Sequence, residues 1–236
     1  MCGRFALTIS PTALAKLFEL DEVPSLEPRY NIAPSQAVAA ILRGREEARR
    51  LLRMMQWGLV PFWAKDPGVG SRLINARAET AAQKPAFRDA FARKRCLIPA
   101  SGFFEWQKRD QDKQPYFIRP REEECFALAG LWQRWEGKEG RVIESCSILT
   151  TGANDLMHPI HDRMPVILQP DQHALWLDIT VNDPERLSSL LKPYPATAMT
   201  AYPVSKNVNR PAHDTPDCIA PLAGAEGFTA SPDLFG

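Results

Sequence analysis

The chain has 236 residues, a length that fits one large domain or two small ones, and we expect one. Its 29 basic and 28 acidic residues give a formal net charge of +1. A global cationic field for nucleic acid or membranes is therefore excluded, and any polyanion must be held by a local patch. Hydrophobic residues make up 44% and charged residues 24%, which is ordinary for a soluble globular protein and argues against disorder.

The five cysteines stand at wide intervals without a CxxC pair, at Cys2, Cys96, Cys125, Cys146 and Cys218. This spacing argues against a structural zinc and against a disulfide framework. The N-terminus lacks the apolar core of a signal peptide, and no stretch approaches the length of a membrane span. We expect a cytoplasmic monomer, associated with the nucleoid if the source is bacterial, that needs no cofactor and no metal.

The predicted elements begin with a helix that starts at Ser10 and Pro11 and ends near Leu20. Two apolar runs, 37–43 and 50–58, flank the charged sequence GREEAR and predict a hairpin. A short helix follows over 85–93. Strand-like segments come next at 95–107, 115–120, 126–135, 142–151 and 164–169, and Asp183 and Pro184 start another short helix. The charged stretches 45–50 and 88–95 are expected to form solvated surface.

Strands dominate this order and helices punctuate it, which predicts the α+β class. We expect a single domain over 1–222, built on a curved, barrel-like, mainly antiparallel β-sheet with short peripheral helices. Residues 223–236 are expected to form a loosely held C-terminal tail.

Position 2 carries the most informative chemistry. If Met1 is removed, which a small second residue permits, Cys2 presents an α-amine and a thiol on adjacent carbons. Such a 1,2-aminothiol traps aldehydes, because the amine forms an imine and the sulfur closes onto it as a five-membered thiazolidine. An α-amine has a pKa of about 7.7 to 8.0 against about 10.4 for lysine, so it is the better nucleophile at neutral pH. The alternative is an inert cysteine, since residue 2 is arbitrary in most proteins.

Five segments together resemble the SRAP family, named for SOS-response-associated peptidases. They are MCGRF at the N-terminus, INARAET from Ile74, SGFFEW from Ser101, HDRMPVIL from His161 and PVSKNVN from Pro203, and they span positions 2 to about 210. The resemblance implies an abasic-site sensor that binds single-stranded DNA. Its N-terminal cysteine would join covalently to the ring-opened aldehyde of a base-free deoxyribose, after a self-processing peptidase activity has exposed that cysteine.

The same resemblance gives roles to polar residues in two of these segments. In an extended INAR segment, Asn75 and Arg77 share a face. By resemblance Asn75 orients the substrate and Arg77 binds phosphate, the alternative for Arg77 being an ion pair with Glu79 or a nearby carboxylate. In GFFEW, alternation places Phe103 with Glu105. The resemblance makes Glu105 the general acid and base, against the alternative of a surface glutamate on an edge strand.

Aromatic residues supply candidate surfaces for base stacking. Trp106 lies on the face opposite Glu105, and Trp63 lies in the proline-flanked loop PFWAKDPG, where contacts with ligands are common. A plain core position is the alternative for Trp106. Both tryptophans are expected DNA contacts.

The HPIHDRMP segment holds two histidines, but Pro159 between them argues against a helical metal site. The family motif matches His161, which would donate a proton to the sugar ring oxygen and release the aldehyde. Its alternative is a core histidine satisfied by Asp162. Arg163 matches a phosphate contact, and Arg4 is a second anchor close to Cys2.

Three functions follow. The first is a DNA-damage protein that shields abasic sites in single-stranded DNA by a Cys2 thiazolidine crosslink, with a possible lyase side activity and reversal of the crosslink. The second is an N-terminal cysteine hydrolase or peptidase that uses Cys2 and His161. The third is a passive single-strand binding module. Near-neutral net charge predicts that binding depends on a few arginines.

Overall fold

The computed structural model describes residues 2–23, 25–44, 49–110, 112–225 and 227–229. Five strands close into a barrel: β3 (Ala37–Arg43), β4 (Arg50–Trp57), β6 (Arg95–Ala100), β9 (Phe126–Glu136) and β10 (Val142–Gly152). Neighbours around the ring pair antiparallel except β4 and β10, and the pairing of β9 with β10 closes it. The expected barrel-like, mainly antiparallel sheet is confirmed, and the predicted hairpin is β3 with β4.

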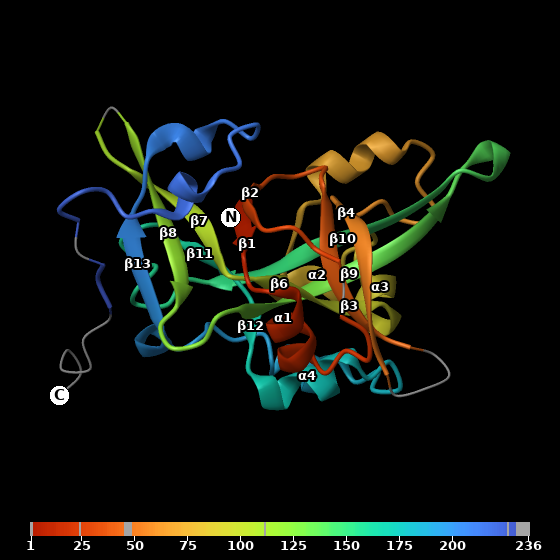
Figure 1. Ribbon diagram of the computed structural model, residues 1–236. Helices are drawn as coiled ribbons and strands as arrows, with labels where there is room; N and C mark the ends of the chain where they lie inside the picture. Colours follow the sequence, from red (N-terminus) through yellow and green to blue (C-terminus); the bar gives the residue numbers. More distant parts are fainter. Residues whose placement is uncertain (1, 24, 45–48, 111, 226, 230–236) are drawn as a thin grey trace.

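A second sheet packs beside the barrel, and we call it the side sheet. Its strand order is β13-β8-β7-β1-β2, with β13 at Met199–Pro203, β8 at Lys113–Pro120, β7 at Gly102–Lys108, β1 at Arg4–Leu7 and β2 at Arg29–Ile32. Figure 1 shows the side sheet on the left and the barrel on the right, with the N-terminus between them. The strand β7 is central in this sheet, which decides the environment of Glu105.

The chain passes from one sheet to the other at Ser101 and Gly102, so the apolar run 95–107 is two strands and not one. The Ser101 hydroxyl accepts hydrogen bonds from the backbone N–H groups of Thr8 and Ile9 at 2.9 and 3.2 Å. A side chain at Gly102 would stand 2.3 Å from the Phe117 ring and 2.6 Å from the Ile118 carbonyl oxygen. Only glycine fits there, and it allows β7 to approach β8 closely.

The helices are short and peripheral. They are α1 (Pro11–Phe18), α2 (Ala78–Ala81), α3 (Arg88–Arg93), α4 (Pro170–Leu177) and α5 (Pro184–Ser188). Ser10 caps α1 as expected, and Asp183 caps α5. Short strands β5 (Asn75–Arg77), β11 (Arg163–Pro165) and β12 (Ile167–Leu168) extend the barrel sheet, with β5 and β11 both pairing with β10.

The side sheet has two differently packed sides. Phe5, Phe103 and Ile118 point to the barrel and join its hydrophobic core. Ala6, Phe104 and others point away and pack under residues 204–219, which we call the covering segment. In Figure 1 this segment is the blue chain above the left-hand sheet. The two sides therefore offer separate chemical environments.

Two expectations need correction. Arg95, at the end of the charged stretch 88–95, is buried and donates five hydrogen bonds to backbone carbonyl oxygens at the ends of α3 and α4 and in the loop after α4. Burial lowers its pKa to about 10. The tail is also not loose throughout, because Phe228 exchanges backbone hydrogen bonds with Ala201. Residues 45–48 and 230–236 lie outside the described part of the chain.

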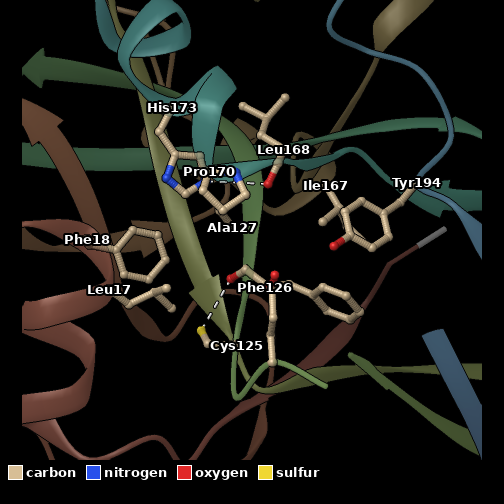
Figure 2. A pocket seen from close by; sticks show the side chains of 11 residues that line it. Leu17, Phe18, Cys125, Phe126, Ala127, Ile167, Leu168, Pro170, His173 and Tyr194 are labelled. Atoms are coloured by element: carbon tan, nitrogen blue, oxygen red, sulfur yellow. Dashed lines mark hydrogen bonds between the residues drawn. The ribbon is translucent and has the colours of Figure 1, made fainter. Parts of the chain in front are cut away.

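A small cavity lies between α1, α4 and the start of β9 (Figure 2). Its volume is about 10 Å³, which is close to the space that one water needs. The ring of His173 stacks on Phe18 there, with ring centroids 5.6 Å apart, and burial lowers the pKa of His173. This cavity is a gap in the packing and does not accommodate a substrate.

Candidate active site

Cys2 lies at the junction between the barrel and the side sheet, just before β1. Its side chain is fully buried, and its carbonyl oxygen accepts a hydrogen bond from Asn75 Nδ2 at 2.8 Å. Asn75 stands on β5, which pairs with the second half of β10, so the barrel holds the amide that holds Cys2. Burial raises the pKa of the Cys2 thiol, and the nearby charge of Glu105 raises it further. At neutral pH this thiol is protonated.

Glu105 points from the centre of β7 toward the barrel, on the same side as Phe103, as the alternation predicts. Its side chain is 2% exposed. Burial raises the pKa of its carboxyl, while the charge of His161 acts in the opposite direction. The alternative of a surface glutamate on an edge strand is therefore wrong, because β7 has strands on both sides. The mutual electrostatic effects also place Cys2, Glu105 and His161 in one neighbourhood.

His161 follows a turned segment that Gln107 holds against β7. Gln107, two residues after Glu105 and on the same side, donates from Nε2 to the Pro159 carbonyl oxygen at 3.0 Å. Sequence reasoning missed this residue, although its period-two spacing from Glu105 was visible. The glutamine brings the histidine turn to the strand that carries the buried carboxylate.

Two groups compete for one nitrogen of the His161 ring, Nδ1, and they require different protonation of that nitrogen. Its Nδ1 accepts from the backbone N–H of Arg163 at 3.0 Å, which requires a lone pair, and also lies 2.8 Å from Asp162 Oδ1, which requires a proton. The first state leaves the neutral ring with its proton on Nε2. Asp162 is 85% exposed, so the backbone bond is the more constant of the two.

Arg163 is tied to Glu79 rather than extended to solvent. Its guanidinium makes a two-pronged pair with the Glu79 carboxylate at 2.6 and 2.9 Å and also donates to the Thr150 carbonyl oxygen. This pairing lowers the pKa of Glu79. Arg77 is exposed, and its guanidinium has no hydrogen bond or ion pair with another described residue. The ion pair with Glu79, which the sequence offers as an alternative role for Arg77, is thus formed by Arg163 instead.

Arg4 and Trp106 lie on the outer side of the side sheet. Arg4 donates to Asn31 Oδ1 at 2.7 Å and to the Val208 carbonyl oxygen at 2.6 Å, while Trp106 donates from Nε1 to Asn209 Oδ1 at 2.7 Å. Both side chains therefore hold the covering segment. The structure does not bring them to the barrel-facing side that carries Glu105.

Trp63 and its neighbour Phe62 are both 55% exposed on the loop after β4. The loop is fixed from both ends. Trp135 Nε1 on β9 donates to the Ala64 carbonyl oxygen at 2.7 Å, and Leu59 N–H donates to the Leu73 carbonyl oxygen at 3.1 Å. Because Leu73 leads into Asn75, this loop presents its aromatic rings from a frame shared with the site.

A further group of polar side chains lies in the covering segment. The ligand-type atoms of His213, Asp217 and Cys218 all lie within 4.8 Å of one another. They are already bonded, because His213 Nε2 contacts Asp217 at 2.8 Å and the Cys218 thiol donates to the His213 carbonyl oxygen at 3.3 Å. Sequence reasoning had considered only His158 and His161 as a metal pair.

A family model identifies the group of proteins to which this chain belongs. The model described as SOS response associated peptidase (SRAP) matches residues 1–211. The chain belongs to the SRAP family. The family match thus ends inside the 1–222 range expected for the domain, which stays a prediction.

Relatives of this SRAP protein carry a common name. It is 44% identical over 223 residues to the abasic site processing protein YoqW of Bacillus subtilis, covering 93% of this chain and 99% of the relative. It is 29% identical to the abasic site processing protein HMCES of Xenopus tropicalis, covering 94% of this chain and 78% of that one. A crystal structure of a Bacteroides thetaiotaomicron protein superimposes with a TM-score of 0.84 at 27% identity, covering 93% and 99% of the two chains. Within the described residues, no helix has the length and apolar character to span a membrane.

Proposed function

We propose that this SRAP protein processes abasic sites in DNA. In detail, Cys2, as the first residue after loss of Met1, forms a thiazolidine with the aldehyde of a base-free deoxyribose in single-stranded DNA. One observation carries the proposal: Asn75 holds Cys2 at a place where its thiol and the buried carboxylate of Glu105 influence each other.

The reaction starts at the α-amine. His161 donates a proton to the ring oxygen of the closed sugar and frees the aldehyde. The neutral amine attacks the aldehyde carbon, and loss of water leaves an imine. Sulfur then bonds to the imine carbon while nitrogen takes up a proton, so that one aminothiol and one aldehyde give one thiazolidine and one water. No oxidant or cofactor enters this balance.

Glu105 suits the proton transfers because burial raises the pKa of its carboxyl. A carboxyl with a raised pKa both accepts and donates a proton closer to neutrality than an exposed one does. We assign it the removal of the amine proton, the donation to the departing water and the reverse step that would reopen the ring. The buried Asn75 Oδ1 accepts no hydrogen bond from the described residues and is a free acceptor for the substrate.

The phosphates need cations beside this site. Arg77 is exposed and without a hydrogen-bonded partner in the described part of the chain, so it is the first phosphate ligand we assign. Arg163 is 16% exposed and already bonded to Glu79, so it supports the site and offers phosphate its remaining edge. Trp63 is the exposed ring on which a neighbouring base would stack.

Thiolate-first hydrolysis fits this environment less well. Burial raises the pKa of the Cys2 thiol, which leaves little thiolate at neutral pH, whereas a hydrolase needs it as the nucleophile. The imine route uses the amine first and the neutral thiol second. Chemical blocking of the α-amine with the thiol left free separates the two routes, because only thiazolidine formation requires both groups.

Intact mass spectrometry tests the proposal. Purified protein is mixed with a single-stranded oligonucleotide that carries one abasic site, and the same oligonucleotide with a normal base is the control. We expect a species without Met1 that gains the mass of the oligonucleotide minus one water. Cys2→Ser should give no thiazolidine, and an absence of any adduct with wild-type protein would refute the assignment.

A weak lyase activity is expected when ring closure fails. An imine at C1 of the opened sugar acidifies the neighbouring carbon and permits β-elimination of the 3′ phosphate. In Cys2→Ala the amine remains while the sulfur is lost. This variant should cleave abasic DNA slowly, and reduction with borohydride should trap its imine.

A further inference from the structure

A groove on the barrel lies beyond the loop that carries Phe62 and Trp63. It is bounded by the ends of β3 and α3, the start of β6, the far half of β9 and the segment after α4, and its volume is about 1050 Å³. The proposed reaction uses none of these elements. The groove is therefore a surface that the active site does not explain.

The groove concentrates positive charge. Five basic side chains line it, at Arg43, Arg93, Lys94, Arg95 and Arg134, against the two acidic side chains of Asp89 and Glu136. Its lining thus carries +3 in a chain whose formal net charge is +1, so the rest of the chain carries −2. A groove with this excess attracts a polyanion more strongly than the remaining surface does on average.

The cations differ in how freely they can bind. Arg95 is buried and saturated by backbone carbonyl oxygens, and Arg43 pairs with Asp178 at 3.3 Å. Arg134 is exposed and pairs with Glu136 on the same strand. Arg93 is exposed at the end of α3, and its guanidinium has no ion pair with another described residue. Arg93 and Arg134 are thus the exposed cations of the groove that no described residue outside its lining engages in an ion pair.

Aromatic rings accompany these charges. Lys94 Nζ lies 5.4 Å from the ring centroid of Trp132, and Phe62, which is 55% exposed, also lines the groove. Cations along a groove together with exposed rings are the combination that binds single-stranded nucleic acid, because phosphates and unpaired bases are offered together. An acidic peptide would use the charges but leave the rings without flat partners.

The loop that carries Phe62 and Trp63 connects the groove with the active site, and hydrogen bonds hold it on both sides. Trp57 Nε1 donates to the Ile74 carbonyl oxygen at 2.9 Å, directly before Asn75, and Trp135 holds the far side of the loop through Ala64. Trp63, the stacking residue of the proposed function, is the neighbour of Phe62. We infer that the groove binds the single-stranded DNA that flanks the abasic site on one side, a role that rests on the proposed function.

Oligonucleotides of two lengths test this inference. Both carry one abasic site, with about two nucleotides on each side in the short one and about ten in the long one. Binding of the full chain and of its double variant Arg93→Glu, Arg134→Glu is followed by fluorescence anisotropy at several salt concentrations, with the abasic sugar replaced by a tetrahydrofuran analogue that has no aldehyde, so that no covalent adduct forms. The matched control is Arg119→Glu, Arg121→Glu, which makes the same charge change at exposed positions of the side sheet and its following turn.

We expect the groove variant to lose about tenfold in affinity for the long oligonucleotide at low salt and to reduce its salt slope by about 1.4, since each single-strand phosphate contact contributes about 0.7. Affinity for the short oligonucleotide should change no more than in the control. Equal losses for both lengths, or equal losses in groove and control variants, would overturn the inference. Failure of wild-type protein to form an adduct with the short oligonucleotide that keeps the natural abasic sugar would instead contradict the proposed function.

Discussion

The two sides of the side sheet use the same strands for different purposes. On the barrel-facing side, Glu105 is buried, and burial raises the pKa of its carboxyl. On the outer side, Arg4 and Trp106 donate hydrogen bonds to residues 208 and 209 of the covering segment, and Arg4 also donates to Asn31. On one side, a buried carboxyl group is kept for the reaction at a cost in folding stability. On the other side, hydrogen bonds and packing add folding stability that offsets this cost.

This contrast explains why neighbouring residues of one motif have different roles. Glu105 and Trp106 are adjacent in sequence and stand on opposite sides of β7, because side chains alternate along a strand. A contiguous motif on a strand therefore does not define a contiguous site. The reactive group is Glu105 with residues from β5 and the histidine turn, whereas Trp106 belongs to a structural layer.

The largest expected effect comes from Glu105→Gln. Loss of the proton carrier should slow adduct formation by about 100-fold or more. The same variant should be more stable than wild type at neutral pH, because it removes a buried charge, with a rise in Tm of about 3 °C for each kcal/mol gained. Single-turnover adduct kinetics and thermal denaturation measure the two effects.

The stability difference between Glu105→Gln and wild type should depend on pH, and the raised pKa of Glu105 sets the direction of that dependence. The pKa of Glu105 is raised in the folded protein above its unfolded value of about 4.5, so the native state keeps a proton that the unfolded state loses. Wild-type stability should fall as pH rises from about 4.5 through the folded pKa. The gap between Glu105→Gln and wild type should therefore open with rising pH and close in acid. A gap that is constant with pH would mean that the carboxyl is not buried as described.

The second effect separates two arginines. Arg77→Ala should lower the slope of binding affinity against salt by about 0.7 and leave Tm unchanged, because an exposed phosphate ligand is lost. Arg4→Ala should instead destabilise the fold by about 2 kcal/mol, because Asn31 Oδ1 loses its donor and the Val208 carbonyl oxygen keeps only the Asn31 amide as a donor. A reduced salt slope with normal Tm in Arg4→Ala would restore the phosphate role expected from sequence.

The sequence predicted what depends on local periodicity. The hairpin of β3 and β4, the cap at Ser10, and the opposite sides of Phe103 and Phe104 follow from spacing within a few residues. The resemblance of five segments also predicted that Cys2, Asn75, Glu105 and His161 act together, and the structure places them in one neighbourhood. Their catalytic roles remain predictions.

What the sequence missed depends on residues far apart in the chain. Arg95 belongs to a charged stretch, but its burial follows from carbonyl oxygens at residues 91, 92, 176, 178 and 181 that only the fold assembles. Arg163 meets Glu79, which lies 84 positions away, and Arg4 meets Val208, which lies 204 away. Charge composition carries no information about such partners. A charged residue in the sequence therefore does not by itself predict that its side chain is exposed.

A smaller effect concerns the position of His161. Gln107→Ala removes the hydrogen bond to Pro159 and should let the histidine turn move away from Glu105, which slows adduct formation by about threefold to tenfold with little change in DNA affinity. Gln107→Glu keeps the length but replaces the donor, and it should slow the reaction as well. If both variants react at the wild-type rate, the turn is held by other contacts and Gln107 does not position the histidine.

The smallest effect is expected on the outer side, in Trp106→Phe. The substitution keeps an aromatic ring but removes the Nε1 donor to Asn209, so stability should fall by about 1 kcal/mol. DNA affinity and adduct rate should stay at wild-type values, because the ring lies under the covering segment and away from Glu105. If the variant binds abasic DNA weakly at unchanged Tm, Trp106 contacts a base, and the division between a reactive side and a structural side of β7 does not hold in the complex.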